Sequence, residues 1–347
     1  MRIAYLTPTS IFSGGEKVTL DIAKAMQRRG FEVAYYGMKG VIQDVVEKTG
    51  IPFICLDSFS TKHVCKALRL YKPDLVHCMD FRATTYASIS GFPFIAHLHN
   101  NPPWLKGYGP NAWAMLFFCL RAKAVITVSH SVFGEFCFSR LFTSDFIARR
   151  IHMVSNCVDI KEVKRKSKEH APIHQTFDVA FIGRFLDQKR PEAFVSCVRQ
   201  IKKSYPGLKA VMLGEGELME TVKTLIDEYE LNNTITLVGH QENPFPWLAA
   251  SKLLIMPSAW EGFGLVAVEA LALGKPVVAC AVGGLKDIVD DSCGALCNDV
   301  NSLASAAAYL LMDSERYSEA SENAAQRAQK YNKFEKYYNT IEHLYRS

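Results

Sequence analysis

Residues 253–279 read LLIMPSAWEGFGLVAVEALALGKPVVA, and this stretch contains the pattern that decides the fold. An apolar run at 253–256 stops at Pro257, a loop with two glycines follows, and an apolar helical segment leads into a second apolar run at 276–279. Runs that are this continuously apolar are typical of parallel strands covered on both faces. The stretch therefore predicts a strand, a loop, a helix and a parallel strand.

The same alternation extends in both directions along the chain. Apolar runs lie at 3–6, 32–36, 52–56, 75–78, 94–98, 125–128, 179–182, 210–213, 235–238, 253–256 and 276–279. Helical segments are expected between them at 16–29, 60–71, 191–203, 217–229 and 265–273. The first of these ends at Gly30, as a helix with a C-cap glycine does. We predict an α/β protein with two doubly wound, Rossmann-like domains.

The length of 347 residues also favours two domains over one or three. A charged, strand-poor segment, 161–175, is the expected linker, so we place the N-terminal domain at 1–165 and the C-terminal domain at 175–330. An aromatic helix within 331–347 can pack back on the first domain. Ligands of such sheets bind beyond the carboxyl ends of the strands, so two facing sheets predict a cleft.

Composition excludes several classes of protein. With 49% hydrophobic and 22% charged residues, the chain is expected to be fully folded. The apolar run at 3–6 leaves no space for the segments of a secretory signal, so we expect a cytoplasmic protein. The longest apolar run, 112–120, has nine residues, about half of the ~20 that span a bilayer. Ten scattered cysteines indicate reduced thiols, and the pair Cys293 and Cys297 lacks a second ligand pair at zinc spacing. We expect no metal site.

Charge is distributed unevenly between the two halves. Residues 1–165 contain 21 Lys and Arg against 12 Asp and Glu, whereas residues 166–347 contain 19 against 23. A basic half is compatible with nucleic acid, an anionic membrane surface or an anionic substrate. No nucleic-acid-binding motif is present in the sequence, so nucleic acid is not an expected partner.

The loop at 257–264 places a helix N-terminus directly after a strand. The backbone N–H groups of Phe263, Gly264 and Leu265 lack partners inside the helix and lie at the positive end of its dipole. Such a helix end binds a diphosphate, and Gly262 and Gly264 allow the phosphate to approach.

Two acidic residues belong to the same segment. Glu261 lies in the loop, where it is placed to meet the hydroxyls of a sugar, and Glu269 lies within the apolar helix. A buried carboxylate is costly unless it accepts hydrogen bonds, and the hydroxyls of a ribose are suitable donors. Spacing alone also allows Glu269 to face water and Glu261 to cap the helix.

Cationic residues follow the first strand of the second domain. Gly183, Arg184 and Lys189 lie where this strand ends, so an Arg fork and a Lys point charge can hold a diphosphate there. They would also stabilise the departing nucleotide diphosphate, and no metal is then required. A solvated basic loop is the alternative.

Gly14 and Gly15 follow the first strand of the chain, where their backbone amides can meet a phosphate or sugar. The pattern is not G-x-G-x-x-G, which argues against a dinucleotide cofactor, and no P-loop is present.

In this order the motifs resemble those of the retaining GT-B enzymes of glycosyltransferase family 4. The resemblance implies that Glu261 contacts the donor sugar, that Glu269 holds the ribose and that Gly239 and His240 lie beside the base. It also implies an active-site histidine, His99, at the end of a strand. Two further residues match the family less closely. His97 fits a packing role better than the active-site position, and Asn156 follows Ser155, where the family usually has Pro.

The resemblance implies metal-independent transfer from UDP-sugar, or next GDP-sugar, to a glycan or lipid-linked acceptor. Transfer of a hexosyl or N-acetylhexosaminyl group in cell-surface polysaccharide or glycolipid synthesis is expected, with no cofactor. A nucleotide-sugar 2-epimerase, a disaccharide phosphorylase and a non-catalytic nucleotide-sugar-binding subunit remain alternatives.

Aromatic and basic residues between 99 and 150 raise the question of the acceptor. Trp104, Leu105, Tyr108 and Trp113 lie in an expected loop at the cleft mouth, and more aromatics follow at 132–142. An amphipathic surface with basic flanks can contact the anionic inner face of a membrane. Alternatively, these aromatics form the core of the domain.

Overall fold

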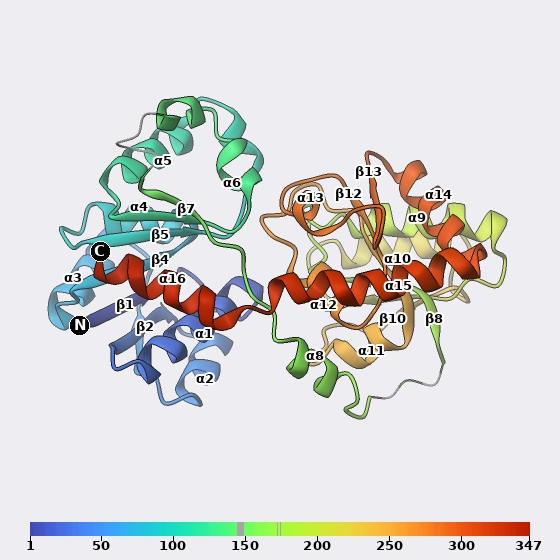
Figure 1. Cartoon of the computed structure of the whole chain (residues 1–347), viewed down its shortest axis with the longest axis horizontal. Coiled ribbons are helices and arrows are strands. Elements are labelled where there is room, and N and C mark those ends of the chain that lie inside the picture. Colours follow the sequence, from blue (N-terminus) through green and yellow to red (C-terminus); the bar gives the residue numbers. More distant parts are fainter. Residues whose placement is uncertain (144–148, 172, 174) are drawn as a thin grey trace. The chain divides into compact units, whose positions relative to one another are not determined.

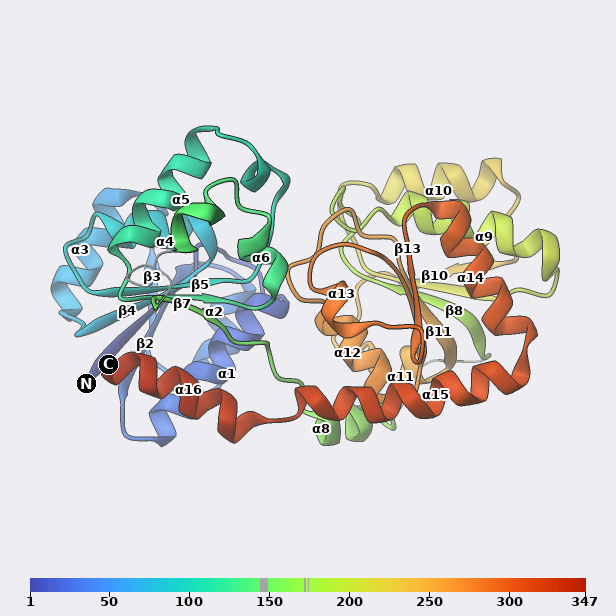
Figure 2. The same cartoon turned by 45° about the horizontal axis from the view of Figure 1, so that its top comes forward.

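The computed structural model describes residues 1–143, 149–171, 173 and 175–347. Contacts divide the chain into two compact units: unit 1 comprises Met1–Asn156 and Phe334–Ser347, and unit 2 comprises Cys157–Lys333. Each unit is built on one sheet of parallel strands with helices on both faces (Figures 1 and 2). This confirms the expected α/β class with two doubly wound domains.

The sheet of unit 1 has seven strands in the order β3-β2-β1-β4-β5-β6-β7. They are β1 (Arg2–Leu6), β2 (Glu32–Met38), β3 (Phe53–Leu56), β4 (Leu75–Met79), β5 (Phe94–Leu98), β6 (Ala124–Thr127) and β7 (Ile151–Met153). The helices are α1 (Gly14–Arg28), α2 (Val41–Glu47), α3 (Thr61–Tyr71), α4 (Asp80–Ser88), η1 (Pro103–Lys106), α5 (Pro110–Arg121), α6 (His130–Gly134), η2 (Ser139–Thr143) and α16 (Phe334–Arg346). The edge strand β7 was not expected from the sequence.

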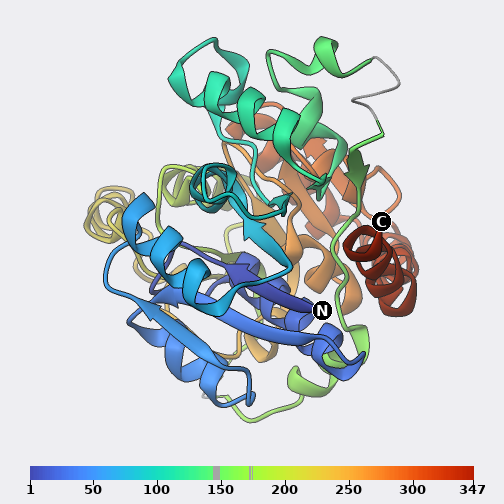
Figure 3. The same ribbon diagram turned by 90° about the vertical axis from the view of Figure 1, so that its left-hand side faces the viewer.

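Helices α1, α2 and α16 cover one face of this sheet, and α3, α4 and α5 cover the other (Figure 2). Helix α16, the last of the chain, packs against α1 (Figure 3). Arg29 contributes to the surface on which α16 packs, and its guanidinium forms ion pairs with Glu335 at 2.9 Å and with Glu342 at 2.8 Å. The C-terminal helix therefore belongs to unit 1 although the chain preceding it belongs to unit 2.

The sheet of unit 2 has six strands in the order β10-β9-β8-β11-β12-β13. They are β8 (Phe177–Ile182), β9 (Ala210–Leu213), β10 (Ile235–Leu237), β11 (Ser251–Met256), β12 (Val277–Cys280) and β13 (Gly294–Cys297). The helices are α8 (Ile160–Lys166), α9 (Pro191–Ser204), α10 (Met219–Glu228), α11 (Phe245–Ala249), α12 (Leu265–Ala272), α13 (Leu285–Ile288), α14 (Val300–Met312), α15 (Ser314–Ala328) and η3 (Gln329–Tyr331). The edge strand β13 was not expected either.

The boundary between the units differs from the expected one. The sequence places the linker at 161–175, of which residues 172 and 174 lie outside the described part of the chain. The contacts place the boundary after Asn156, so that α8 is part of unit 2. This helix packs against α11 and α12.

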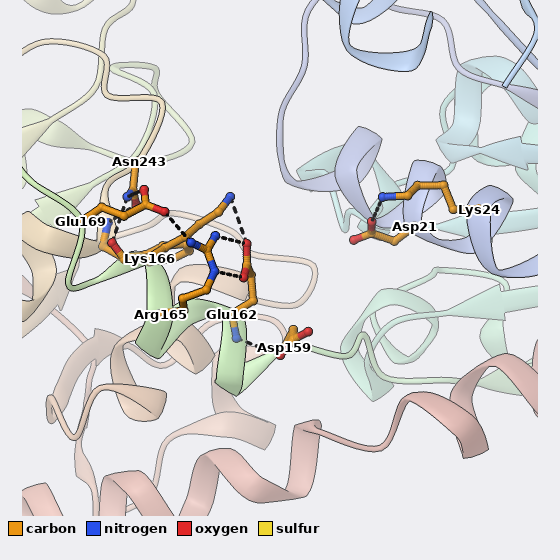
Figure 4. A network of polar contacts seen from close by, with 9 residues as sticks. Asp21, Lys24, Asp159, Glu162, Arg165, Lys166, Glu169 and Asn243 are labelled. Atoms are coloured by element: carbon orange, nitrogen blue, oxygen red, sulfur yellow. Dashed lines mark hydrogen bonds and ion pairs between the residues drawn. The ribbon is translucent and has the colours of Figure 1, made fainter. Parts of the chain in front are cut away.

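Polar contacts hold α8 in a region of high charge (Figure 4). Asp159 caps the helix by accepting the backbone N–H of Glu162 at 2.9 Å. Arg165 pairs with Glu162 at 2.7 Å and with Glu169 at 2.8 Å, and Asn243 donates to Glu169 at 2.8 Å. Short-range ion pairs thus stabilise a helix whose sequence reads as a charged linker. Figure 4 also shows a pair in unit 1, Lys24 with Asp21 at 4.0 Å.

Local sequence explains why the site-bearing helices begin where they do. Ser13 and Glu16 form a capping box at the start of α1, and Pro191 occupies the first turn of α9. In unit 2 the strands β8, β11 and β12 are neighbours, so the loops that follow them meet at one edge of the sheet. In unit 1 the same holds for β1, β4 and β5.

Candidate active site

The loop after β11 ends at the N-terminus of α12, as expected. Gly264 precedes the helix with φ of 107°, a left-handed conformation that favours glycine. A Cβ at Gly264 would lie 2.7 Å from Leu285 Cδ2, so a side chain here would require Leu285 to move in addition to straining the backbone. Phe263, Gly264 and Leu265 therefore present the first turn of α12, and Glu269 lies half-buried further along the helix.

The loop after β8 lies directly beside it. The backbone N–H of Ala259 donates to the Gln188 carbonyl at 2.9 Å, and the Gln188 amide donates to the Trp260 carbonyl at 3.2 Å. Between these contacts Lys189 Nζ bonds Glu261 Oε2 at 2.5 Å. The structure thus brings together the cationic and acidic residues that the sequence had placed in separate motifs.

The Lys189–Glu261 pair is largely removed from water. The two side chains are 18% and 11% exposed, and the Ser258 hydroxyl lies 3.4 Å from the same Glu261 oxygen. Gly183 packs on the stem of Lys189, since a Cβ there would lie 3.3 Å from Lys189 Cγ. Arg184 is exposed. The chain thereby holds an ammonium, which can bind a phosphate, and a carboxylate, which can accept from hydroxyl donors, within one ion pair.

The predicted base-side residues join this edge through the loop after β9. The backbone N–H of Gly214 donates to the Gly239 carbonyl at 2.9 Å, and that of Phe185 donates to the Glu215 carbonyl at 2.8 Å. The Glu215 carboxylate also accepts the backbone N–H of His240 at 3.2 Å. Gly239, His240 and the β8 loop are therefore neighbours along one sheet edge, and Glu215, which sequence reasoning missed, connects them.

Gly284 is a second residue that was missed. It follows β12, and its backbone N–H donates to the Glu261 carbonyl at 2.9 Å. A Cβ there would lie 2.6 Å from the Gly262 carbonyl oxygen and 2.7 Å from Phe263 Cα. The loop after β12 thus packs against the loop after β11, and the adjacent Gly283 and Gly284 in the sequence were the available signal.

In unit 1, Gly14 and Gly15 form the first turn of α1. Glu16, which is 5% exposed, accepts the backbone N–H of Ser13 at 3.0 Å, so a carboxylate already lies at this helix N-terminus. A Cβ on Gly15 would lie 3.4 Å from Met79 Sδ, at the end of β4. The glycine pair therefore adjoins the carboxyl end of β4.

His99 follows β5, next to that point. Its backbone N–H donates to Asp80 Oδ1 at 2.6 Å, and its ring packs on that of His97 with centroids 4.0 Å apart and a tilt of 33°. Both ring nitrogens of His99 are buried without a hydrogen-bond partner among the described residues. Burial lowers the pKa of His99 to about 4, so its imidazole is neutral at pH 7.

Asp80 is the third residue that sequence reasoning missed. It begins α4 with φ of 59°, which is strained for a residue with a side chain. Burial raises the pKa of its carboxyl to about 7, although the N–H groups of His99 and Asn100 oppose that effect. Strain and a raised pKa in one carboxylic acid are features of functional sites.

A cavity of about 230 Å³ opens beside Asp80 in unit 1. The residues that line it are Asp80, Phe81, Arg82, Leu98, Asn100, Pro102, Trp104, Leu105 and Met115. Aromatic surface together with a carboxyl, an amide and a guanidinium is suited to a sugar. A larger groove of about 650 Å³ between α9 and α14 contains none of the expected site residues.

The surface expected to contact a membrane differs from the sequence prediction. Leu105 is buried at 1% exposure and Trp104 packs on Phe81 at 4.7 Å, so neither is part of an exposed loop. Residues 110–121 form helix α5, because Pro110 starts a helix at its first turn. Of the four residues expected in that loop, Tyr108 and Trp113 face water, and Phe117 of α5 is exposed as well. Within 132–142 the aliphatic and aromatic core members are Val132, Phe136, Phe138 and Phe142.

The two softer matches lie inside the fold. His97 is fully buried, in keeping with a packing role, and Asn156 is 3% exposed at the end of unit 1. All ten cysteines are free, Cys293 and Cys297 among them. Among the residues that the structure describes, none forms a group of three or more His, Cys, Asp or Glu side chains that could hold a metal ion. In the same part of the chain, no helix is long and apolar enough to cross a membrane.

Two family models match the chain. The model described as Glycosyltransferase Family 4 matches residues 12–162, and the model described as Glycosyl transferases group 1 matches residues 162–327. Together the two models match residues 12–327, and the chain belongs to the glycosyltransferases that they describe. Its fold is the GT-B fold of such enzymes.

Relatives agree with this assignment. An uncharacterized glycosyltransferase of Methanocaldococcus jannaschii is 26% identical over 252 residues, and the match spans 64% of this chain but only 60% of the relative. The UDP-Gal:alpha-D-GlcNAc-diphosphoundecaprenol alpha-1,3-galactosyltransferase of Escherichia coli is 21% identical over 335 residues, 88% of this chain and 86% of the relative. The crystal structure of Anabaena HepE in complex with UDP and glucose has a TM-score of 0.84 at 20% identity and covers 99% of each chain.

Proposed function

We propose that this enzyme transfers a hexosyl or N-acetylhexosaminyl group, with retention of configuration, from a nucleotide diphosphate sugar to a hydroxyl of a glycan or lipid-linked acceptor. The observation that carries the proposal is the Lys189–Glu261 ion pair of 2.5 Å beside the N-terminus of α12. A cation and a helix N-terminus suit a diphosphate, and the adjacent carboxylate suits the hydroxyls of the attached sugar.

In the proposed reaction, the acceptor oxygen forms a bond to the anomeric carbon while the bond from that carbon to the phosphate oxygen breaks. The proton of the acceptor hydroxyl passes to the departing diphosphate. Lys189 and Arg184 stabilise the negative charge that develops on the diphosphate, and Glu261 orients the sugar. No covalent intermediate on the protein is proposed.

The same residues support transfer without a metal ion or other cofactor. A divalent cation in phosphate chemistry neutralises oxygens of the leaving group. Here the Lys189 ammonium, the Arg184 guanidinium and the backbone N–H groups at the start of α12 are available for that task. We therefore propose that turnover does not depend on added Mg²⁺ or Mn²⁺.

UDP is the nucleotide we propose for the donor, with GDP as the next choice. The Escherichia coli relative has a UDP-sugar in its name, and the Anabaena structure is a complex with UDP. Gly239 and His240 are the residues proposed to lie beside the base, and Glu269 is proposed to accept hydrogen bonds from the ribose. His99 remains the proposed active-site histidine of unit 1.

For the acceptor, the cavity beside Asp80 is the proposed sugar site, because Trp104 and Asn100 offer an aromatic face and an amide. A lipid-linked acceptor is supported by the surface of α5, on which Trp113, Phe117 and Leu120 are 55%, 48% and 45% exposed. We propose that this surface contacts an anionic membrane, as in the synthesis of a cell-surface polysaccharide or glycolipid.

Charge supports the membrane proposal as well. Spacings of four and three place Trp113, Phe117 and Leu120 on one stripe of α5, and the Arg121 guanidinium lies 5.4 Å from the Phe117 ring. Residues 81–150 contain seven Lys and Arg against two Asp and Glu. Apolar side chains with basic neighbours bind an anionic bilayer surface at its interface.

A donor screen tests the proposed function. Thermal stabilisation by each sugar nucleotide identifies the donor, since a ligand that binds the folded state raises its stability. Incubation of that donor with a lipid-linked acceptor should release the nucleoside diphosphate and join the sugar with unchanged anomeric configuration, as read by NMR. An epimerised sugar nucleotide formed without any acceptor, or an inverted product, would overturn the proposal.

A further inference from the structure

Unit 1 contains a line of buried polar side chains that the proposed reaction does not use. Tyr5 Oη lies 3.2 Å from Tyr345 Oη, Tyr345 Oη lies 2.6 Å from His77 Nδ1, and His77 Nε2 lies 3.1 Å from His97 Nδ1. All four side chains are at most 1% exposed. The line begins at β1, passes through α16, and crosses β4 to reach β5.

The chemistry of the two groups gives the line a direction. A tyrosine hydroxyl is a stronger hydrogen-bond donor than the N–H of a neutral imidazole, and the bare imidazole nitrogen is a stronger acceptor than a phenol oxygen. In the contact of 2.6 Å between Tyr345 and His77 we therefore assign the tyrosine hydroxyl as the donor. His77 Nδ1 is then the acceptor, which leaves the proton of this imidazole on Nε2.

His77 in turn determines the tautomer of His97. Burial lowers the pKa of His77 to about 3 and that of His97 well below its ordinary value, so each ring is neutral and has one N–H. The His77 Nε2–H donates to His97 Nδ1 at 3.1 Å. His97 must therefore hold its proton on Nε2.

The line ends beside His99. His97 Nε2 is buried without a hydrogen-bond partner among the described residues, and the His97 ring supports that of His99 at 4.0 Å between centroids with a 33° tilt. Asp80 holds the backbone N–H of His99 at 2.6 Å. The position of the His99 imidazole thus depends on His97, while Asp80 holds the backbone of His99.

Helix α16 is well placed to hold the other end. Its residue Tyr345 has its carbonyl bonded by Lys123 Nζ at 2.9 Å, and Arg29 donates to Asn339 at 2.7 Å and to Glu342 at 2.8 Å. These contacts fix the helix at both ends on unit 1. A hydroxyl on such a helix can impose its orientation on the rings it contacts.

We propose that Tyr345 is a positioning residue for the transfer reaction, which acts through His77 and His97 to hold the His99 imidazole in one orientation. This inference rests on the proposed function in one respect, the place of His99 at the reacting centre. The C-terminal helix α16 would then contribute to catalysis without contacting the substrate itself.

The test uses the full-length chain with ¹⁵N-labelled histidine and the variant Tyr345→Phe, which removes only the hydroxyl. The wild type should show His77 and His97 protonated on Nε2 at pH 7.5, and the variant should show mixed or reversed tautomers. Turnover should fall about tenfold, the equivalent of one lost hydrogen bond, with little change in the donor KM. Tyr36→Phe is the control, since the Tyr36 hydroxyl is buried without a hydrogen-bond partner among the described residues.

Two substitutions of His77 make the test independent of how well Tyr345→Phe folds. Glutamine at this position can accept from Tyr345 and donate to His97, so His77→Gln should keep the His97 tautomer and most of the turnover. His77→Leu should lose both. Wild-type tautomers and turnover in Tyr345→Phe and His77→Leu would overturn the inference. Full turnover in His99→Ala would instead refute the proposed role of His99, while the tautomers would still decide whether the line exists.

Discussion

Lys189→Ala is expected to damage both stability and turnover, and the structure allows the two effects to be separated. The ammonium lies 2.5 Å from Glu261 Oε2, and the two side chains are 18% and 11% exposed. Removing the lysine leaves the carboxylate enclosed without its cation, and breaking a buried pair in this way costs about 3–5 kcal/mol. For a unit of this size, 1 kcal/mol corresponds to about 2–4 °C, so we expect the Tm of unit 2 to fall by roughly 6–20 °C.

Turnover should fall for a different reason. If Lys189 stabilises the departing diphosphate, its loss should lower kcat/KM by about 10²–10³. The double variant Lys189→Ala with Glu261→Gln removes both charges, so most of the lost stability should return. Turnover should remain low, because the cation is still missing. Unfolding is followed by calorimetry without ligand, and turnover by release of the nucleoside diphosphate.

Recovery of wild-type turnover in the double variant would refute this reasoning, since the pair would then serve stability alone. Lys223→Ala is the matched control in the same unit. Its ammonium lies 2.8 Å from Glu220, and the two side chains are 52% and 83% exposed. Exposed pairs contribute about 1 kcal/mol or less, so this variant should keep its turnover and nearly all of its stability.

Four further outcomes are expected. Arg184→Ala should lower turnover by about 10²–10³ with an unchanged Tm, and full activity of this variant would contradict the proposed role of Arg184 at the diphosphate. Turnover of the wild type should survive EDTA, and loss of activity that Mg²⁺ restores would contradict transfer without a metal ion. Asp80 has a pKa raised from 3.8 to about 7 in the folded chain, so its contribution to stability is lost as the pH rises from about 4 to 7. Asp80→Asn, which tolerates left-handed backbone, should therefore gain stability relative to the wild type between pH 4 and pH 8 in thermal unfolding, and a pH-independent difference would speak against the raised pKa. The double variant Trp113→Ser with Phe117→Ser should co-sediment less with anionic vesicles at low salt than the wild type, while donor hydrolysis persists. Equal co-sedimentation of the variant and the wild type would favour a soluble acceptor.

Much of the fold could be predicted because most strands are buried on both faces. Runs such as those of β1 and β11 are continuously apolar, and this signal does not depend on the rest of the chain. The strands that escaped prediction are β7 and β13, which lie at sheet edges and are three and four residues long. Half-exposed edge strands do not need an apolar run, so their sequences resemble loops.

Helix α8 was not predicted either, because its sequence has little of the apolar pattern of a packed helix. Its sequence, IKEVKRK, contains little apolar periodicity, and it was therefore interpreted as a linker. The helix is stabilised by Asp159 at its N-terminus and by pairs of Arg165 with Glu162 and Glu169. Such contacts depend on spacings of three and four that also occur in disordered charged segments.

In the candidate site, too, residues within short local motifs could be predicted, whereas residues that act through contacts distant in sequence could not. In unit 2, Lys189 and Glu261 each lie in a short motif at the end of a strand, so their types and spacing were sufficient to place them at one edge. In unit 1, His77 and His97 lie within apolar strands and look like packing residues, and Tyr345 is 268 residues from His77. Nothing in the local pattern of a strand indicates that its histidine accepts from a helix at the other end of the chain. A buried histidine becomes informative only when the partners of both ring nitrogens are known, because those partners decide which nitrogen has the proton.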